Sequence, residues 1–315
     1  MTDILFIKTS SLGDVIHHMP AVTETARQRP EARLSWLVEE AFAPLVRMHP
    51  AVSEVIPVAW RRWRKSLYAP ATLAEIAGSL RAMRARRYDE IVDSQGLLRS
   101  ATIARLARGH RQGYDRDSIR EPLASMFYDV RHRVSRNLHA ISRNRMLTAL
   151  ALGYAPQGAP DYGFDRKRFA APDARYAVLL HATARPEKQW TEENWLALGA
   201  TLARRGLDLV LPWGNEAERA RSERIAERVV GARVPPRAPL DEVAKLIAGA
   251  QLVVGVDTGL MHLAAAFGVP LVAIFCGSNP GLTGPVGSGP LAVLGGEDET
   301  PSVAAVKKAI ATIEG

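Results

Sequence analysis

Three polar segments that each follow an apolar run contain the residues best suited to chemistry. In the first, Ser10, Ser11, Leu12 and Gly13 lead to Asp14 at the expected start of a helix. The small residues let a ligand approach the backbone, and a carboxylate at a helix N-terminus stays ionised and can accept a proton from an attacking hydroxyl. The same position is typical of an aspartate that caps a helix, so both interpretations stay open. The turn lacks the G-x-G-x-x-G fingerprint, which disfavours a dehydrogenase.

The second segment is an Asp-Thr-Gly turn between an apolar run and a helix, within residues 253–262. Free backbone N–H groups at such a helix start can hold a diphosphate. Thr258 and His262 are four residues apart, so they share one face of the helix. Asp257 would repel a phosphate, and we assign it to sugar hydroxyls or to the geometry of the turn. An ordinary capped helix with a hydrogen-bonded histidine explains the same pattern.

The third segment, 181–190, follows another apolar run and contains Thr183 and Lys188. Lys188 can neutralise a diphosphate as it becomes a leaving group, a task that a metal ion performs in other enzymes. Glu218 follows a further predicted strand, where its carboxylate can accept hydrogen bonds from ribose hydroxyls. The alternatives are a solvated loop lysine and an exposed glutamate at a helix start.

Basic residues are concentrated in the first half of the chain. The sequence has 41 Lys and Arg against 33 Asp and Glu, a formal net charge of +8 that favours anionic partners. The run RRWRK at 61–65 suits the phosphate or carboxylate groups of an acceptor, or an anionic bilayer surface. Arg120 and His139 can extend this surface, although most basic runs are only solvated. No RNA-binding or helix-turn-helix signature accompanies the charge, which disfavours nucleic acid.

Apolar runs alternate with segments of helical spacing throughout the chain, which predicts parallel sheets covered by helices. We expect strands at residues 4–8, 34–38, 55–58, 90–93, 176–181, 207–211, 252–256 and 270–275. We expect helices at residues 15–27, 41–48, 71–86, 137–152, 241–248, 259–267 and 302–313, with others that start near residues 99, 191 and 216. Between the last strand and the last helix, residues 277–301 are expected to be loop-rich.

The length of 315 residues predicts two domains of ordinary size. We place an acceptor-binding Rossmann-like domain at 1–160, a linker at 161–175 and a donor-binding Rossmann-like domain at 176–301. The C-terminal helix, at 302–315, can pack back on the first domain. Doubly wound domains bind ligands at the carboxyl ends of their strands, so a central cleft that both domains face is the predicted active site.

The composition is that of a cytoplasmic globular protein without a metal site. Cys276 is the only cysteine, and no apolar run approaches the roughly 18 residues that span a bilayer. The apolar stretch at the N-terminus is too short for a signal peptide. No Cys/His cluster has metal-ligand spacing, and the D-x-D of Asp115 and Asp117 lies in a polar loop. We predict no metal and no cofactor.

Six motifs together resemble heptosyltransferase I, a group within glycosyltransferase family 9 that builds the lipopolysaccharide core. They are KTSSLGDVIH at 8–17, IPVAWRRWRK at 56–65, DSQGL at 93–97, REPLAS at 120–125, HAT at 181–183 and VDTGLMH at 256–262. The resemblance covers nearly the whole chain and implies a GT-B fold. It also implies an inverting transfer of L-glycero-D-manno-heptose from ADP-heptose, a co-substrate, to the inner Kdo of Kdo2-lipid A, with Asp14 as the general base.

The family pattern assigns further roles. Donor contacts are implied for Thr183, Ala184, Lys188, Glu218, Asp257, Thr258, Gly259 and His262, with Lys188 also catalytic. Ala184 stands where relatives have a second threonine, so a hydroxyl to the diphosphate is missing there or replaced by a backbone N–H. Acceptor contacts are implied for Lys8, Ser10, Ser11, Gly13, Arg61, Arg62, Arg64, Lys65, Arg120 and His139.

The implied partners are ADP-heptose, Kdo2-lipid A and the anionic cytoplasmic face of the inner membrane, on which we expect a peripheral monomer. Three alternatives stay open. The first is an enzyme that adds the second core heptose, against which the RRWRK and REP motifs argue. The second is a nucleic-acid-binding protein, suggested by the net charge alone. The third is a protein that binds a nucleotide sugar without transferring it, or an epimerase.

Overall fold

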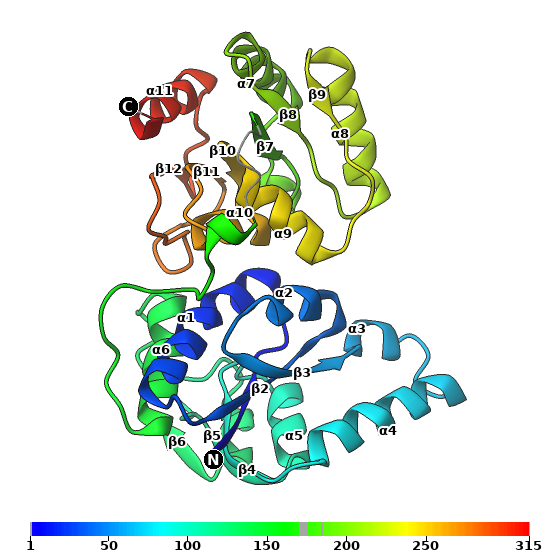
Figure 1. Ribbon diagram of the computed structural model, residues 1–315, viewed down its shortest axis with the longest axis vertical. Helices are drawn as coiled ribbons and strands as arrows, with labels where there is room; N and C mark the ends of the chain where they lie inside the picture. The colour runs from blue at the N-terminus through cyan, green and yellow to red at the C-terminus, as the bar shows by residue number, and fades with distance from the viewer. Residues whose placement is uncertain (1, 170–174, 184, 315) are drawn as a thin grey trace. The chain divides into compact units, whose positions relative to one another are not determined.

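The computed structural model describes residues 2–169, 175–183 and 185–314. The chain forms two compact units, Met1–Gly163 and Phe164–Gly315. Each unit is built around a parallel sheet of six strands with helices on its faces (Figure 1). The α/β class and the doubly wound architecture predicted from the sequence are therefore confirmed, and the boundary between the units falls inside the predicted linker.

The sheet of unit 1 has the strand order β3-β2-β1-β4-β5-β6. Its strands are β1 (Asp3–Ile7), β2 (Arg33–Glu39), β3 (Val52–Val58), β4 (Tyr88–Asp93), β5 (Gly109–Tyr114) and β6 (Val130–His132). The chain proceeds from β1 outward through β2 to β3, and then returns to pair β4 with the other side of β1. The carboxyl ends of β1 and β4 therefore flank the point where the strand order reverses, which is where such sheets bind ligands.

The helices of unit 1 cover both faces of this sheet. They are α1 (Leu12–Gln28), η1 (Glu40–Phe42), α2 (Ala43–Arg47), α3 (Trp60–Trp63), α4 (Pro70–Arg84), α5 (Leu98–Leu106), η2 (Pro122–Phe127) and α6 (Ala140–Leu152). Helices α1 and α6 lie side by side (Figure 1). A buried ion pair joins them, because Arg145 donates to Glu24 from Nε and Nη2 at 3.0 and 3.1 Å. Arg145 also donates to the carbonyls of Gln157 and Gly158, so its charge is used inside the unit.

Unit 2 repeats the same arrangement, with the strand order β12-β11-β10-β7-β8-β9. Its strands are β7 (Tyr176–Leu180), β8 (Asp208–Val210), β9 (Ala232–Arg233), β10 (Leu252–Val256), β11 (Leu271–Cys276) and β12 (Leu291–Gly296). Here β7 and β10 are the central neighbours, in the place that β1 and β4 occupy in unit 1. The reversal of strand order therefore lies between the carboxyl ends of β7 and β10.

The helices of unit 2 include the C-terminal segment. They are η3 (Arg166–Arg168), η4 (Pro186–Lys188), α7 (Glu192–Arg204), α8 (Glu216–Arg228), α9 (Leu240–Gly249), α10 (Gly259–Ala266) and α11 (Val303–Glu314). Val306, Ala309 and Ile310 of α11 belong to the core of unit 2, together with Trp195 and Leu198 of α7. The apolar face of the C-terminal helix is thus buried in its own unit, and the packing of this helix on the first domain stays a prediction.

The segment before β7 is attached to unit 2 as well. Phe164 stacks on Phe267 with ring centroids 4.7 Å apart, and Phe169 meets the same ring edge-on. Arg166 donates to the carbonyls of Ala248 and Ala250 at 2.8 and 2.7 Å. Residues 164–169, which the sequence placed in the linker, are therefore packed on the second unit.

Four strands were not predicted from the sequence: β5, β6, β9 and β12. The loop-rich assignment of residues 277–301 is wrong in its last part, because β12 pairs in parallel with β11 along its whole length. The sequence LAVLGG of β12 contains two glycines and lies at the edge of the sheet, where pairing to one neighbour decides the conformation. None of the helices in the described parts of the chain has the length and apolarity that crossing a bilayer requires.

Candidate functional site

Asp14 lies in the first turn of α1, directly after β1. The helix starts at Leu12 with Ser11 as its N-cap residue, earlier than the start near residue 15 predicted from the sequence. The Asp14 carboxylate accepts hydrogen bonds from the backbone N–H of Ser11 at 2.7 Å and from the Ser11 hydroxyl at 3.0 Å. Ser11, not Asp14, is therefore the N-cap residue, and the half-buried Asp14 side chain is the acceptor of a capping box at the third helical position. The capping interpretation is supported in this form, and the role of Asp14 as a base stays a prediction.

Gln95, in the loop after β4, holds the β1–α1 turn from the other side of the strand-order reversal. Its Oε1 accepts hydrogen bonds from the backbone N–H groups of Thr9 at 2.8 Å and Ser10 at 3.0 Å. The backbone N–H of Gln95 donates in turn to Oδ1 of Asp93 at 2.9 Å. The ends of β1 and β4 are thus joined by a hydrogen-bond network that supports the turn carrying Asp14.

Asp93, the last residue of β4, anchors this hydrogen-bond network. The carboxylate is fully buried and accepts a hydrogen bond from the Tyr128 hydroxyl at 2.8 Å and another from the backbone N–H of Gly96 at 3.3 Å. Burial raises the pKa of Asp93, and these hydrogen bonds oppose that shift. Gly96 has φ of +69°, a left-handed conformation that glycine adopts without strain. The loop that carries Gln95 therefore has its own fixed shape.

Lys8, predicted to contact an acceptor, is a buried cation at the end of β1. Its exposed fraction is 6%, and Nζ donates to the carbonyl of Ser94 at 2.8 Å. Burial lowers the pKa of the Lys8 ammonium, whereas the charges of Asp14 and Asp93 raise it. Lys8 therefore supplies a positive charge underneath the Asp14 turn, and its contact with an acceptor stays a prediction.

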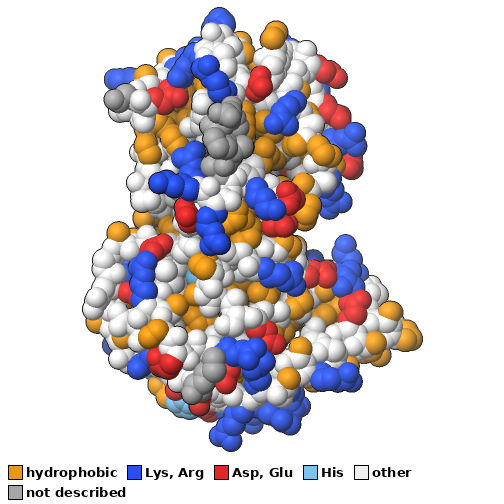
Figure 2. All heavy atoms as spheres, in the orientation of Figure 1, with side chains coloured by type: hydrophobic (Ala, Val, Ile, Leu, Met, Phe, Trp, Pro, Cys, Tyr) orange, Lys and Arg blue, Asp and Glu red, His pale blue; other side chains and the backbone are white. Residues whose placement is uncertain are grey.

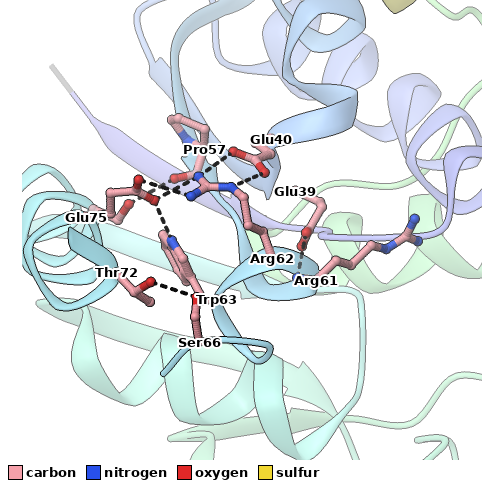
Figure 3. Close-up of polar contacts among 10 residues, drawn as sticks. Glu39, Glu40, Pro57, Arg61, Arg62, Trp63, Ser66, Thr72 and Glu75 are labelled. Atoms are coloured by element: carbon pink, nitrogen blue, oxygen red, sulfur yellow. Dashed lines mark hydrogen bonds and ion pairs between the residues drawn. The ribbon is translucent and has the colours of Figure 1, made fainter. Parts of the chain in front are cut away.

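The basic run RRWRK lies on α3 and the turn that follows it, and one of its arginines is already paired (Figure 3). Arg62 donates to both oxygens of Glu40, at 3.1 and 3.0 Å, and to Glu75 at 3.0 Å. Trp63 donates from its indole nitrogen to Glu75 at 2.7 Å. The hydrogen bonds from Arg62 and Trp63 lower the pKa of Glu75. Arg62 therefore fixes α3 against its neighbours, and its charge is balanced locally.

The other cations of this run are exposed. Arg61, Arg64 and Lys65 form no ion pair with any residue that the structure describes. In Figure 3 the Arg61 side chain points away from the Arg62 cluster, and its guanidinium lies 5.4 Å from the centre of the Phe42 ring. Three of the four cations in the run therefore keep their charge for an anionic ligand.

Arg120 and His139 lie on segments tied to the same end of the unit 1 sheet. Arg120 is exposed, and the carboxylate of the next residue, Glu121, accepts a hydrogen bond from the backbone N–H of Leu98 at the start of α5. His139 is the N-cap residue of α6, where its Nδ1 accepts from the backbone N–H of Ile141 at 3.2 Å. The capping role explains the histidine locally, and its contact with an acceptor stays a prediction.

In unit 2, Lys188 and Asp257 form an ion pair. Lys188 follows β7, Asp257 follows β10, and Nζ lies 2.5 Å from Oδ2. The Ser278 hydroxyl, located after β11, donates to the same carboxylate oxygen at 3.0 Å. The two charged side chains are 20% and 17% exposed. Asp257, for which the sequence predicts contacts with sugar hydroxyls or a role in turn geometry, therefore binds the ammonium group of Lys188 that is predicted to meet the diphosphate.

The N-terminus of α10 lies beside this ion pair. Thr183 donates from its hydroxyl to the carbonyl of Asp257 at 3.0 Å, which brings the β7 and β10 loops together. Thr258 is the N-cap residue of α10, and its side chain makes no capping hydrogen bond with the described part of the chain. Backbone N–H groups at such an end can bind an anion. Gly259 begins the helix, and His262 is buried within it.

The remaining predicted donor residues are Glu218 and Ala184. Glu218 is in the first turn of α8, where its carboxylate accepts from the backbone N–H of Gly214 at 2.7 Å and from the Asn215 side chain at 2.8 Å. The Asn215 side chain caps the same helix. Glu218 is half-buried rather than fully exposed, and its carboxylate lies beside the turn that follows β8. Ala184 lies outside the described residues.

Arg221, on α8, fixes the loop that carries Thr183 and Lys188. It donates to the carbonyls of His181 at 3.1 Å and Trp190 at 2.6 Å. His181 is fully buried, and burial, assisted by the Arg221 charge, lowers its pKa to about 4. His181 is therefore neutral near pH 7 and serves as an anchor of the loop.

The D-x-D motif has a structural explanation. Asp115 accepts a hydrogen bond from the backbone N–H of Ser118 at 2.8 Å and so shapes its own loop. Across residues 2–169, 175–183 and 185–314, no three His, Cys, Asp or Glu side chains gather in a way that could hold a metal ion. The prediction of a metal-independent site stays a prediction.

Comparison with known proteins relates this geometry to a family. The family model described as "Glycosyltransferase family 9 (heptosyltransferase)" matches residues 77–310. Lipopolysaccharide heptosyltransferase 1 of Salmonella typhimurium is 44% identical over 294 residues, which cover 92% of this chain and 93% of that protein. The chain belongs to glycosyltransferase family 9.

Solved structures from this family share the fold over the whole chain. Escherichia coli heptosyltransferase WaaC, with ADP and with ADP-2-deoxy-2-fluoro heptose, is 41% identical and matches with TM-scores of 0.93 and 0.89, covering 99% of both chains. By sequence alone, a more distant relative is lipopolysaccharide heptosyltransferase 2 of E. coli, which is 25% identical over 306 residues, 90% of this chain and 85% of that protein. The two doubly wound units of this glycosyltransferase are those of a GT-B fold.

Gln95, Arg221 and Ser278 were not singled out from the sequence of this family 9 member. Gln95 lies in the DSQGL motif, so its position next to a strand end was visible, but its target on the β1–α1 turn was not. Arg221 lies in the middle of a charged helix, where nothing in the sequence distinguishes it from its neighbours. Ser278 follows a strand predicted from the sequence, and the loop-rich assignment of its segment hid it.

We predict that Gln95→Ala loosens the β1–α1 turn. Loss of one acceptor for two backbone N–H groups should raise the hydrogen-exchange rates of the Thr9 and Ser10 amides roughly tenfold, as expected for about 1.4 kcal/mol. Exchange measured by NMR or mass spectrometry on intact protein tests this. Gln95→Glu keeps an acceptor oxygen and should protect both amides, and unchanged exchange in the alanine variant would contradict the role of Gln95.

Proposed function

We propose that this chain is a lipopolysaccharide heptosyltransferase that moves L-glycero-D-manno-heptose from ADP-heptose to the inner Kdo of Kdo2-lipid A. The observation that carries the proposal is the similarity over 99% of the chain to an E. coli heptosyltransferase bound to ADP and to a fluorinated ADP-heptose. The site agrees with this chemistry, because the residues expected to act lie at the strand-order reversal of each sheet.

Transfer to the first position of the core, rather than the second, is supported by two observations. Identity is 44% to a relative named heptosyltransferase 1 and 25% to one named heptosyltransferase 2. The exposed cations Arg61, Arg64 and Lys65 also suit an acceptor that carries phosphates and carboxylates. We therefore place the sugar on Kdo itself.

Asp14 is the proposed general base. Its carboxylate takes the proton from a Kdo hydroxyl while the hydroxyl oxygen forms a bond to the anomeric carbon of heptose. The bond from that carbon to the ADP oxygen breaks on the opposite face, so the configuration inverts and ADP leaves with the electron pair. Ser11 fixes the carboxylate, and the buried Lys8 ammonium lies at the end of β1 beneath the same turn.

Lys188 and the N-terminus of α10 are the proposed stabilisers of the leaving ADP. The ammonium is already held at the end of β7 by Asp257, so it needs little reorganisation to meet the negative charge that develops on the diphosphate. The backbone N–H groups at the N-terminus of α10 add a partial positive charge that can bind the same diphosphate. Asp257 then remains beside the sugar, and Glu218 beside the nucleoside.

We further propose that the protein acts as a peripheral monomer at the anionic cytoplasmic face of the inner membrane. The support is the set of exposed cations on and after α3, together with the lipid nature of the proposed acceptor. The proposed transfer uses no metal ion and no cofactor, and nucleic acid is not among the proposed partners.

The function is tested by offering two acceptors with ADP-heptose. We expect transfer to Kdo2-lipid A and none to the product that already carries the first heptose, as measured by mass spectrometry of the glycolipid. Transfer to the heptosylated acceptor alone would assign the second core position. Release of ADP without any transfer in the presence of acceptor would reject the transferase.

We expect Asp14→Asn to lower kcat by roughly 10²-fold, because the amide cannot accept the proton of the attacking hydroxyl. The amide oxygen can still accept the hydrogen bond from Ser11, so ADP affinity measured by calorimetry should stay unchanged. Asp117→Asn, at an exposed position in the same unit, is the matched control. Turnover near that of the wild type would remove Asp14 from its assigned role.

We expect Lys188→Ala to lower kcat/KM for ADP-heptose by roughly 10²-fold, corresponding to about 3 kcal/mol of leaving-group stabilisation. The variant also uncovers Asp257, so a Lys188→Ala/Asp257→Asn pair separates the lost ammonium from the added repulsion. Lys245→Ala, at an exposed ion pair of α9, serves as the control. Wild-type activity should persist in EDTA, and a strict need for a divalent cation would contradict the role of Lys188.

A further inference from the structure

Unit 1 contains an apolar cavity of about 390 Å³ between α3, α4 and α5, and none of its lining residues belongs to the Asp14 turn. Trp63 and Met83 form its buried inner side, and Leu80 and Ile103 extend its walls from α4 and α5. At the outer side, Leu106 is 46% exposed. Figure 2 shows hydrophobic side chains in the recess between the α4 segment and the rest of unit 1.

The two hydroxyl groups that line this cavity are already hydrogen-bonded. Ser79 donates from its hydroxyl to the carbonyl of Pro57 at 3.1 Å, and Thr102 donates to the carbonyl of Leu98 at 2.8 Å. The guanidinium of Arg99 lies 5.7 Å from the centre of a ring of Trp60. A ligand that fills the cavity therefore needs no hydrogen-bonding groups of its own, which fits an alkyl chain.

The helix that forms one wall of the cavity also carries the basic run. Trp60 and Trp63 contribute to the wall, and Arg61 and Arg62 lie between them on the same turn of α3. Arg62 is paired with Glu40 and Glu75, whereas Arg61 is exposed (Figure 3). Residues 60–106 contain ten Lys and Arg but four Asp and Glu. The surroundings of the cavity are therefore positively charged.

We propose that this cavity binds one acyl chain of the glycolipid acceptor while the exposed cations of the RRWRK run bind its anionic groups. The identity of the glycolipid rests on the proposed function, but the recognition chemistry does not: it is an alkyl chain joined to an anionic head. A volume of about 390 Å³ falls in the range of small-molecule sites and is lined almost wholly by carbon. Apolar recesses of this kind on a protein surface mark binding sites for apolar groups.

The proposal is tested first with alkyl phosphates, because these probes carry only the two groups invoked. Octyl, nonyl and decyl phosphate are titrated into the full-length protein by calorimetry, each below its aggregation concentration, with inorganic phosphate as the reference. Each added methylene should lower Kd about fourfold while the chain lies in the cavity, since one buried CH₂ contributes about 0.8 kcal/mol. The slope with chain length isolates the cavity, because the contribution of the head group is common to all probes.

Two substitutions at exposed lining positions should flatten that slope. Thr102→Trp fills the cavity and Leu106→Glu makes its outer side polar, and each should weaken decyl phosphate binding at least tenfold. Ala82→Trp, on an exposed position of α4 that does not line the cavity, is the matched control and should keep the wild-type slope. An equal slope in Thr102→Trp, Leu106→Glu and the wild type would overturn the proposal.

The acceptor assay then connects the cavity to the enzyme. Thr102→Trp should raise KM for acylated Kdo2-lipid A at least tenfold, and leave KM for the fully deacylated acceptor and for ADP-heptose unchanged. An equal change for both acceptors would overturn the acyl-chain assignment. If no acceptor is glycosylated, the proposed function fails, and the alkyl phosphate series still decides whether the cavity binds a chain.

Sedimentation of the same variants examines a second copy of this chain as the occupant. The proposal expects the wild type and Thr102→Trp to sediment alike at every concentration. A wild-type dimer that dissociates in Thr102→Trp would show that the cavity is an interface between copies, and would overturn the assignment to a lipid chain.

Discussion

The order of parallel strands is the constraint on which both halves of this protein depend. In each sheet the chain starts at a central strand, proceeds to one edge, and returns to the other side of the starting strand. The loops after β1 and β4 therefore lead to opposite faces of their sheet, and so do the loops after β7 and β10. Between the two loops of each pair, at the carboxyl ends of the strands, a crevice is left that backbone and side chains of both loops line. The two side chains to which we assign a catalytic role lie just beyond such strand ends: Asp14 in the first turn of α1, after β1, and Lys188 in η4, after β7.

Each of these junctions is closed by hydrogen bonds between its two loops. In unit 1 the Gln95 amide oxygen binds the N–H groups of Thr9 and Ser10. In unit 2 the Thr183 hydroxyl binds the Asp257 carbonyl, while Lys188 binds the Asp257 carboxylate. The two junctions use unrelated residues for the same purpose, which is to set the position of one charged side chain before a ligand arrives. Such preorganisation is what electrostatic catalysis requires.

The sequence predicted the interior of the fold better than its edges. The strand 252–256 was predicted with the bounds that the structure shows, because a buried central strand is a continuous apolar run with turn residues on both sides. By contrast, β5 has the sequence GHRQGY, and nothing in its pattern is typical of a strand. Residues 109–114 form a strand because they pair with β4 on one side and β6 on the other. Pairing with strands elsewhere in the chain cannot be recognised from the local sequence pattern.

The candidate site shows the same division. The positions of Asp14 and Lys188 next to strand ends followed from the sequence, because the carboxyl ends of parallel strands meet at one edge. Their partners did not, since Gln95 and Ser278 reach their targets through contacts between segments far apart in the chain. The Lys188–Asp257 pair shows what the sequence does not reveal. Each side chain was assigned to a different part of the donor, and the ion pair between them was not predicted.

Net charge alone is a poor guide to where anions bind in this protein. Arg145 and Lys8 are buried, and their donors are used by a carboxylate and by backbone carbonyls. Arg62 is exposed but shared between two glutamates, so the field that it presents to solvent is small. What distinguishes Arg61 is a position on α3, next to an apolar wall, without such a partner among the described residues. The sequence counts all of these cations alike, and only their partners decide which of them remain to attract an anion.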